Sequence, residues 1–181
     1  MEYRGYDSAG ISVCHENKLT IIKKKGKIGN LQGAVPEDLP GCYGIGHTRW
    51  ATHGEVNDLN AHPHSDASGK ITIVHNGIIE NYISIRKKLA AEGVEFITET
   101  DSEVIAHLVA KFYDGDLESA VKETLKHIKG TYGIVAIHAD EPCRLVGARN
   151  GSPLVLGIGE GEMFLASDVT AMMAYTKQVV Y

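Results

Sequence analysis

The side chains best suited to chemistry begin in a polar run, HTRWATHG at 47–54. Arg49 presents a planar guanidinium whose fork of N–H donors matches a carboxylate. Trp50 is the only tryptophan of the chain, and an aromatic ring beside an arginine can wall a small-ligand pocket. A surface arginine stacked on a half-buried tryptophan would have the same local composition. The run is therefore compatible with a carboxylate site and with a plain surface contact.

Two histidines follow in the run NAHPH at 60–64. His62 and His64 stand at i and i+2, a spacing that can place two imidazoles on one metal ion in an extended segment. The run contains no cysteine and no acidic residue to complete such a site, and Pro63 stiffens it. We therefore expect these histidines to form hydrogen bonds within the loop, and we predict no metal. A metal-dependent hydrolase that uses His53, His62 and His64 is the alternative.

The run His75-Asn76-Gly77 is expected to close a strand and to open a helix. Asn-Gly is first of all a turn signal. The same pair can also form an oxyanion hole, in which the Asn76 side-chain amide and the Gly77 N–H donate to a carbonyl oxygen that becomes negatively charged. Glycine permits the close backbone approach that such a site requires.

Asp101 lies in a predicted capping box that runs from Thr100, the N-cap, to Glu103. An acid in a first helical turn is stabilised by the helix dipole by roughly 0.3–1 kcal/mol, which explains this residue without any ligand. It can also pair with the ammonium of a small substrate. Together with Arg49 and the Asn-Gly pair, Asp101 suggests a pocket for an amino acid whose side-chain amide is attacked. These residues include no nucleophile.

The elements that must position these residues follow from hydrophobic periodicity. Apolar runs predict strands, and apolar residues spaced by three and four predict helices. Strands come first, helices next and strands again last, which favours an α+β fold with a mainly antiparallel sheet covered on both faces. The expected strands are 11–14, 19–22, 43–47, 71–74, 96–98, 133–138, 144–147, 154–157 and 163–166, and the expected helices are 78–89, 100–112, 117–128 and a short one from 167.

Length and composition describe an ordinary globular domain. The chain has 181 residues, 43% of them hydrophobic, and a net charge of −5, which gives no reason to expect nucleic acid or an anionic membrane as a partner. No apolar run approaches the length of a membrane span. Cys14, Cys42 and Cys143 form no CxxC pair, so we expect a reducing, cytoplasmic location and buried structural cysteines.

Six runs together resemble one enzyme family over essentially the whole chain. They resemble the glutaminase domain of the isomerising glutamine–fructose-6-phosphate aminotransferases, which are class II glutamine amidotransferases. The runs are EYRGYDSAG at 2–10, HTRWATHG at 47–54, NAHPH at 60–64, HNGIIEN at 75–81, TETDSEVIAHL at 98–108 and RNGSPLVLGIG at 149–159.

This resemblance implies the N-terminal-nucleophile hydrolase fold, a four-layer αββα sandwich. It implies that residues 1–181 are a glutamine amidotransferase type-2 domain, incomplete at the N-terminus because the first strand and helix, with the nucleophilic cysteine, would precede Glu2. L-glutamine would be hydrolysed through a thioester to glutamate and ammonia, without a cofactor. The ammonia would pass to a C-terminal sugar isomerase domain that makes glucosamine 6-phosphate from fructose 6-phosphate, in a homo-oligomer.

The resemblance also implies roles for individual residues. Arg49 would bind the α-carboxylate of glutamine and Asp101 its α-amine, and Asn76 and Gly77 would form the oxyanion hole. The other residues carried over are Thr52, His53 and His62 as pocket lining, Trp50 as a gate on access, and Arg4 as a group that orders the N-terminus. We expect the chain alone to be inactive, and the alternative is a non-catalytic glutamine- or glutamate-binding module.

Overall fold

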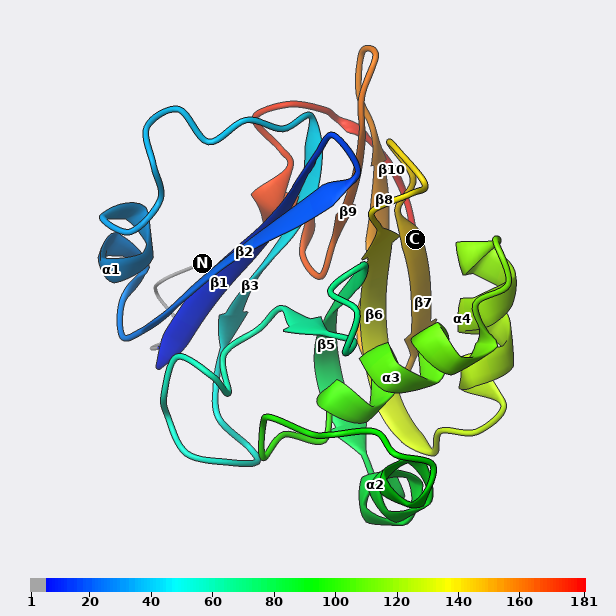
Figure 1. Cartoon of the computed structure of the whole chain (residues 1–181). Coiled ribbons are helices and arrows are strands. Elements are labelled where there is room, and N and C mark those ends of the chain that lie inside the picture. Colours follow the sequence, from blue (N-terminus) through cyan, green and yellow to red (C-terminus); the bar gives the residue numbers. More distant parts are fainter. Residues whose placement is uncertain (1–5) are drawn as a thin grey trace.

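The computed structural model describes residues 6–181, so the role expected of Arg4 lies outside the described residues. The helices between residues 82 and 125 lie between two blocks of strands, as the sequence predicts, whereas the helix at 28–32 and the strands at 64–65 and 178–180 were not predicted (Figure 1). The strands are β1 (Ser8–His15), β2 (Lys18–Lys25), β3 (Tyr43–Arg49), β4 (His64–Ser65), β5 (Ile71–Ile79), β6 (Gly130–His138), β7 (Val146–Asn150), β8 (Val155–Ile158), β9 (Met163–Ala166) and β10 (Gln178–Val180). The helices are α1 (Ile28–Gln32), α2 (Tyr82–Ala91), α3 (Glu103–Phe112), α4 (Leu117–Leu125) and the 3₁₀ turn η2 (Val169–Ala171).

Two antiparallel sheets face each other in the middle of the molecule. One has the order β2-β1-β3 and the other β4-β5-β6-β7, while β10-β8-β9 forms a third, smaller sheet. Helices α2, α3 and α4 lie on the face of the β4-β5-β6-β7 sheet that is turned away from the β2-β1-β3 sheet (Figure 1). The short α1 lies beside β1 and β2, on the other side of the molecule. The layers therefore follow the order helix, sheet, sheet, helix, with α1 as the small fourth layer.

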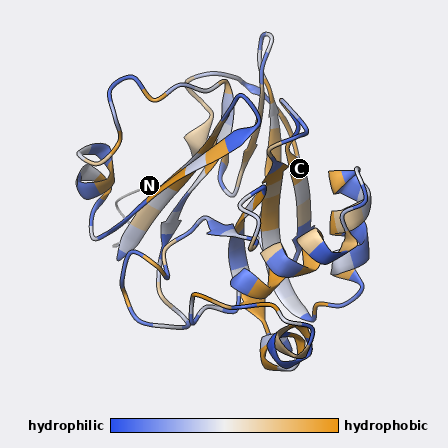
Figure 2. Ribbon diagram, in the orientation of Figure 1, coloured by the Kyte–Doolittle hydropathy of each residue, from blue (hydrophilic) through white to orange (hydrophobic). Residues whose placement is uncertain are grey.

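Alternation along β5 explains why its sequence is apolar on both faces. Ile71, Ile73 and Ile79 pack under α2, α3 and α4 in the larger core, whereas Val74 packs toward β3 in a second core between the sheets. Side chains two residues apart share one face of a strand. Figure 2 shows hydrophobic residues concentrated along the central strands and hydrophilic ones in the connecting loops. The expected sheet covered on both faces is confirmed.

The turn expected at Asn76-Gly77 is wrong. β5 continues through both residues to Ile79, and the ladder pairs Asn76 with Gly133 and Gly77 with Tyr132. Gly77 has a φ of +133°, and a Cβ there would stand 2.1 Å from the Thr131 carbonyl oxygen. Glycine thus lets β5 approach β6 closely, and the following helix begins at Tyr82 instead of residue 78.

The expected capping box before α3 is also wrong. The helix begins at Glu103, and Thr100 does not cap it. The Glu103 carboxylate accepts hydrogen bonds from the backbone N–H groups of Ile97 and Thr98, each at 2.9 Å. Asp101 therefore precedes the helix, and residues 96–98, expected as a strand, form an irregular segment held to the helix start.

Other boundaries and burials also differ from the expectations. The helix expected at 117–128 is α4, which ends at Leu125, and the strand expected at 144–147 is β7, which lies at Val146–Asn150. Cys14 is buried as expected, but Cys42 and Cys143 are exposed, so the interpretation of all three as buried cysteines is wrong for two of them. Within residues 6–181, no helix has the length and apolar character to cross a bilayer.

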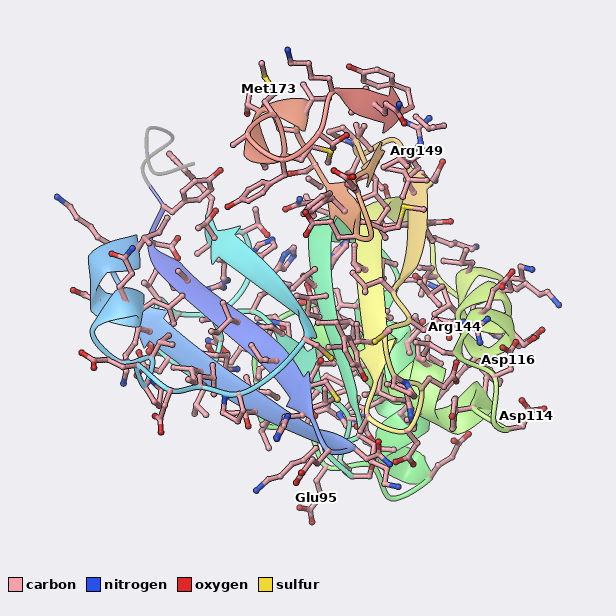
Figure 3. The ribbon with its side chains drawn as sticks, turned by 90° about the horizontal axis from the view of Figure 1, so that it is seen from above. Glu95, Asp114, Asp116, Arg144, Arg149 and Met173 are labelled. Carbon is pink, nitrogen blue, oxygen red and sulfur yellow. The ribbon has the colours of Figure 1, made fainter. Side chains whose placement is uncertain are left out.

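Arg144, in the segment between β6 and β7, ties that segment to the start of α4. Asp116 caps α4 by accepting from the Ser119 N–H at 2.9 Å, and its other oxygen takes a 2.7 Å hydrogen bond from Arg144. Arg144 also reaches Glu141 at 2.7 Å. Figure 3 shows Arg144 and Asp116 lying close together at this edge of the molecule.

We predict that Gly77→Ala destabilises the fold more than an ordinary positive-φ substitution does. The matched control is Gly115→Ala, at a φ of +109° with open space around the added methyl group. Backbone strain alone costs about 1–3 kcal/mol, whereas Gly77→Ala also drives a methyl group into the β6 backbone. In urea unfolding, Gly77→Ala should lower the free energy of unfolding by at least about 2 kcal/mol more than the control substitution does. Equal losses would contradict the close-approach explanation.

Candidate functional site

A cavity of about 890 Å³ lies where the end of β3, the middle of β5 and the segment before α3 meet. It brings together all the sequence-predicted site residues that belong to the described part of the chain. These are Arg49, Trp50, Thr52, His53, His62, Asn76, Gly77 and Asp101. Ile11, Ile28 and Leu31, from β1 and α1, add an apolar part to the lining.

Arg49, the last residue of β3, is buried with its guanidinium turned into the loop that follows. It donates to the carbonyl oxygens of Glu55 at 3.3 Å, Gly54 at 3.5 Å and His53. Burial lowers the pKa of Arg49 from its usual value, and the carboxylates of Asp7 and Asp101 oppose that shift. The side chain is therefore a cation that the loop holds in place at the cavity wall.

The loop after β3 is irregular in conformation but has fixed anchors. Asp7 accepts from the Ala51 N–H at 2.5 Å. Glu99 accepts from the Glu55 N–H at 3.0 Å and from the Asn60 side-chain amide at 3.1 Å. Asn60 also accepts from the Glu99 N–H at 3.0 Å. The loop that holds Arg49 is thus fastened to the segment that carries Asp101.

Asp101 is 3% exposed and divides its two carboxylate oxygens between the fold and the cavity. Oδ2 accepts from the Ile79 N–H at 2.8 Å, which ties it to the end of β5. Oδ1 lies 3.8 Å from the His53 Nδ1 atom and 3.5 Å from the Ser102 hydroxyl. Oδ1 is therefore the oxygen available to a cation that enters the cavity.

Asn76 is exposed on β5 and its side-chain oxygen lies 2.9 Å from the Nε2 atom of His47. His47 is on β3, opposite Asn76 across the space between the two sheets. Burial lowers the pKa of His47 from 6.5 to about 4, so the ring is neutral near pH 7. A neutral imidazole that donates from Nε2 leaves the Asn76 NH₂ group free to donate elsewhere.

The expectation that His62 and His64 form hydrogen bonds in their loop is only partly met. The His62 ring lies tilted against His47, with centroids 4.2 Å apart, and meets His64 edge-on at 4.4 Å. His64 Nε2 lies 3.2 Å from the Thr100 hydroxyl, but the Nδ1 atoms of His62 and His64 have no partner among residues 6–181. Within that range, no cluster of side chains able to hold a metal ion is found.

The remaining predicted residues lie around the mouth of the cavity. Trp50 is 65% exposed on the rim. The Thr52 hydroxyl lies 3.3 Å from His53 Nδ1, and the His53 ring contacts Tyr82 edge-on at 5.3 Å. His53 therefore stands between the rim and Asp101.

Sequence reasoning missed three residues that shape the site, namely Asp7, His47 and Ser102. His75 on β5 lies 2.8 Å from the Ser102 hydroxyl through Nδ1, which joins β5 to the start of α3. A signal for His47 was present, because it ends the strand predicted at 43–47, and β3 continues to Arg49, two residues on, which places both residues on one face. No local pattern pointed to Asp7 or Ser102, whose partners are distant in sequence.

We predict that acid destabilises the fold through the buried histidines. Burial lowers the pKa of His47, His62, His64 and His75. Below about pH 6.5 the unfolded chain binds protons that the folded chain does not, so stability present at higher pH is lost as the pH falls. His47 alone should contribute a loss on the order of 2 kcal/mol between about pH 7 and about pH 5.

Urea midpoints measured across that pH range test this expectation. His47→Gln should reduce the pH dependence, whereas His15→Gln, at an exposed position, is the matched control and should leave it unchanged. A free energy of unfolding that is constant from about pH 7 to about pH 5 would contradict the prediction.

Comparisons with known proteins agree on the family. The glutamine amidotransferase domain family matches residues 47–174. Glutamine–fructose-6-phosphate aminotransferases (isomerising) of Aquifex aeolicus and Pyrococcus horikoshii are 54% and 52% identical over 99% and 100% of this chain. The chain spans 31% of the length of each of these relatives.

Solved structures show the same fold. Glutamine phosphoribosylpyrophosphate amidotransferase from B. subtilis superposes with a TM-score of 0.80 at 28% identity, over 97% of this chain and 39% of its own. A glutamine aminotransferase class-II domain protein from Silicibacter pomeroyi, at 18% identity and a TM-score of 0.61, covers 85% of this chain and 76% of its own. The fold is thus that of the N-terminal-nucleophile hydrolases, and the chain belongs to the glutamine amidotransferase domain family.

Proposed function

We propose that the cavity binds L-glutamine and serves the hydrolysis of its side-chain amide to glutamate and ammonia. The observation that carries this proposal is that Arg49, Asn76, Gly77 and Asp101 line one cavity. They supply a cation, two amide donors and a carboxylate. These groups match the α-carboxylate, the amide carbonyl and the α-ammonium of glutamine. Glutamine is also the donor named in the relatives.

Charge pairing supports the orientation of the ligand. Arg49 is held at one wall by loop carbonyls, and Asp101 turns Oδ1 toward the cavity. Each charge-assisted hydrogen bond to the ligand contributes roughly 1.5–3 kcal/mol when it is shielded from water. Thr52, His53 and His62 complete this end of the cavity, and Trp50 on the rim would control access to it.

Donor geometry supports the role of the Asn-Gly pair. The Ile79 N–H donates to Asp101 instead of β6, while the Glu80 N–H donates to the carbonyl of Lys129, just before β6 begins. Residues two apart in a strand point their N–H groups toward the same edge. The Gly77 N–H therefore points to the Asp101 side, where it can join the Asn76 amide at an oxygen that becomes negative.

Ammonia release needs a nucleophile, and no cysteine is among the described residues that line the cavity. The Cys14 thiol is buried and lies 3.8 Å from the Ala139 carbonyl oxygen. Residues 1–181 alone therefore favour the second candidate, a glutamine- or glutamate-binding module. Ammonia release discriminates between the two. We infer that a leading cysteine of the family type supplies the thiol in the active protein.

The wider setting is proposed from the relatives. This chain spans 31% and 30% of the length of two such relatives, which are named for amino transfer to fructose 6-phosphate. We propose that the ammonia released here serves the synthesis of glucosamine 6-phosphate in a sugar isomerase domain, within a homo-oligomeric cytoplasmic enzyme.

The first functional prediction concerns binding. Arg49→Ala and Asp101→Ala should each weaken L-glutamine binding to residues 1–181 at least tenfold, because each change leaves one ligand charge unpaired. Arg49→Lys should restore binding only in part, since an ammonium cannot make the bidentate contact. Calorimetric titration measures this, with Arg144→Lys, remote from the cavity, as the matched control. The same affinity in all variants would place the ligand elsewhere.

The second functional prediction concerns turnover. In the complete natural polypeptide that contains these residues, Asn76→Ala should lower kcat for glutamine hydrolysis by roughly 10²–10³, the usual loss for one oxyanion donor. Residues 1–181 alone should release no ammonia above background. Near-full kcat in the Asn76 variant would show that this residue only continues the strand, and turnover by residues 1–181 that depends on an internal cysteine would overturn the nucleophile assignment.

A further inference from the structure

The contact between His47 and Asn76 decides which end of the Asn76 amide faces the cavity. An asparagine side chain presents an acceptor oxygen on one side and an NH₂ donor on the other. Only the NH₂ group can stabilise a negatively charged oxygen. In the structure the oxygen lies 2.9 Å from His47 Nε2, so the NH₂ group is the end left for a ligand.

The direction of that hydrogen bond depends on the His47 tautomer. A neutral imidazole either donates from Nε2 or accepts there, and acceptance would turn the Asn76 amide around so that its oxygen faced the cavity. With the proton on Nε2, the ring donates to the Asn76 oxygen and the amide keeps the orientation seen in the structure, with its NH₂ group left for a ligand.

Two observations support a proton on Nε2 and a fixed ring position. His47 Nδ1 is buried without a partner among residues 6–181, and an unpaired imine nitrogen is better tolerated there than an unpaired N–H. The His47 ring also contacts His62, which meets His64 edge-on, and His64 Nε2 lies 3.2 Å from the Thr100 hydroxyl. These contacts hold the His47 ring in position.

We propose that His47 is a positioning residue, which donates from Nε2 to the Asn76 side-chain oxygen and so aims the Asn76 NH₂ group at the reacting carbonyl. This assignment rests on the proposed glutaminase function. His47 does not touch the substrate carbonyl itself. It acts through Asn76, and its loss should change turnover more than ground-state binding.

A spectroscopic test needs no catalytic activity. In ¹⁵N-labelled residues 1–181 near pH 7, the His47 ring should be neutral with its proton on Nε2, and a scalar coupling should connect Nε2 to the Asn76 side-chain carbonyl carbon. His47→Gln should keep the distinct Asn76 NH₂ resonances, because its amide can donate in the same place, and His47→Leu should lose them. A proton on Nδ1 would overturn the proposal.

A kinetic test uses the complete natural polypeptide. His47→Leu should lower kcat on the order of 10–100-fold, as expected for a misaimed group, and change KM less than about threefold. His47→Gln should recover most of kcat. In the Asn76→Ala background, His47→Leu should lower kcat little further, because both substitutions remove the same contribution of the Asn76 amide. His138→Leu is the matched control, since it removes a buried imidazole that stacks on Tyr113 4.0 Å away, outside the cavity.

The outcomes separate the two proposals. A wild-type protein without glutaminase activity would reject the proposed function, and the spectroscopic result would still decide the role of His47. An active enzyme in which His47→Leu keeps full kcat, or lowers kcat equally with and without Asn76, would reject the positioning role. Circular dichroism of each variant identifies any loss of folding, in which case the Gln variant carries the comparison.

Discussion

The close pairing of β5 with β6 is the constraint on which both the core and the cavity depend. Nine residues of each strand pair in one antiparallel register, and β5 is covered by helices on one face and by β3 on the other. Because the ladder continues past Val74, Asn76 and Gly77 are held in a strand instead of a mobile turn. The glycine at 77 makes this possible, since any larger residue would collide with the β6 backbone. A rigid strand thereby delivers the amide donors to the cavity.

Electrostatic balance is the second requirement of the site. Arg49 is a buried cation whose charge is favoured by the carboxylates of Asp7 and Asp101, while the neighbouring histidines are kept neutral by burial. Charged imidazoles beside Arg49 would repel it in a region with little water. The neutral histidines therefore add no positive charge beside Arg49, and the pairing of Arg49 with Asp101 in the cavity lining suits a zwitterionic amino acid.

Much of this arrangement could be predicted from the sequence, and the errors have physical causes. The strand blocks and Arg49 were found because periodicity and side-chain chemistry are local properties. The turn at Asn76-Gly77 was predicted wrongly because a local propensity of Asn-Gly lost to nine residues of ladder pairing. The capping box was predicted wrongly because the Glu103 carboxylate accepts hydrogen bonds from the backbone N–H groups of Ile97 and Thr98. The contact between His47 and Asn76 joins two strands, so no single segment encodes it.

The fastening of the loop after β3 has a consequence for the entropy of ligand binding. Residues 50–60 have no regular secondary structure, yet the side chains of Asp7, Asn60 and Glu99 hold their backbone at several points. Ordering a free segment of this length would consume much of the interaction energy of a small ligand, at about 1–2 kcal/mol per residue. Here that ordering is completed during folding. The cavity wall is therefore ordered before a ligand binds, and more of the contact energy contributes to affinity.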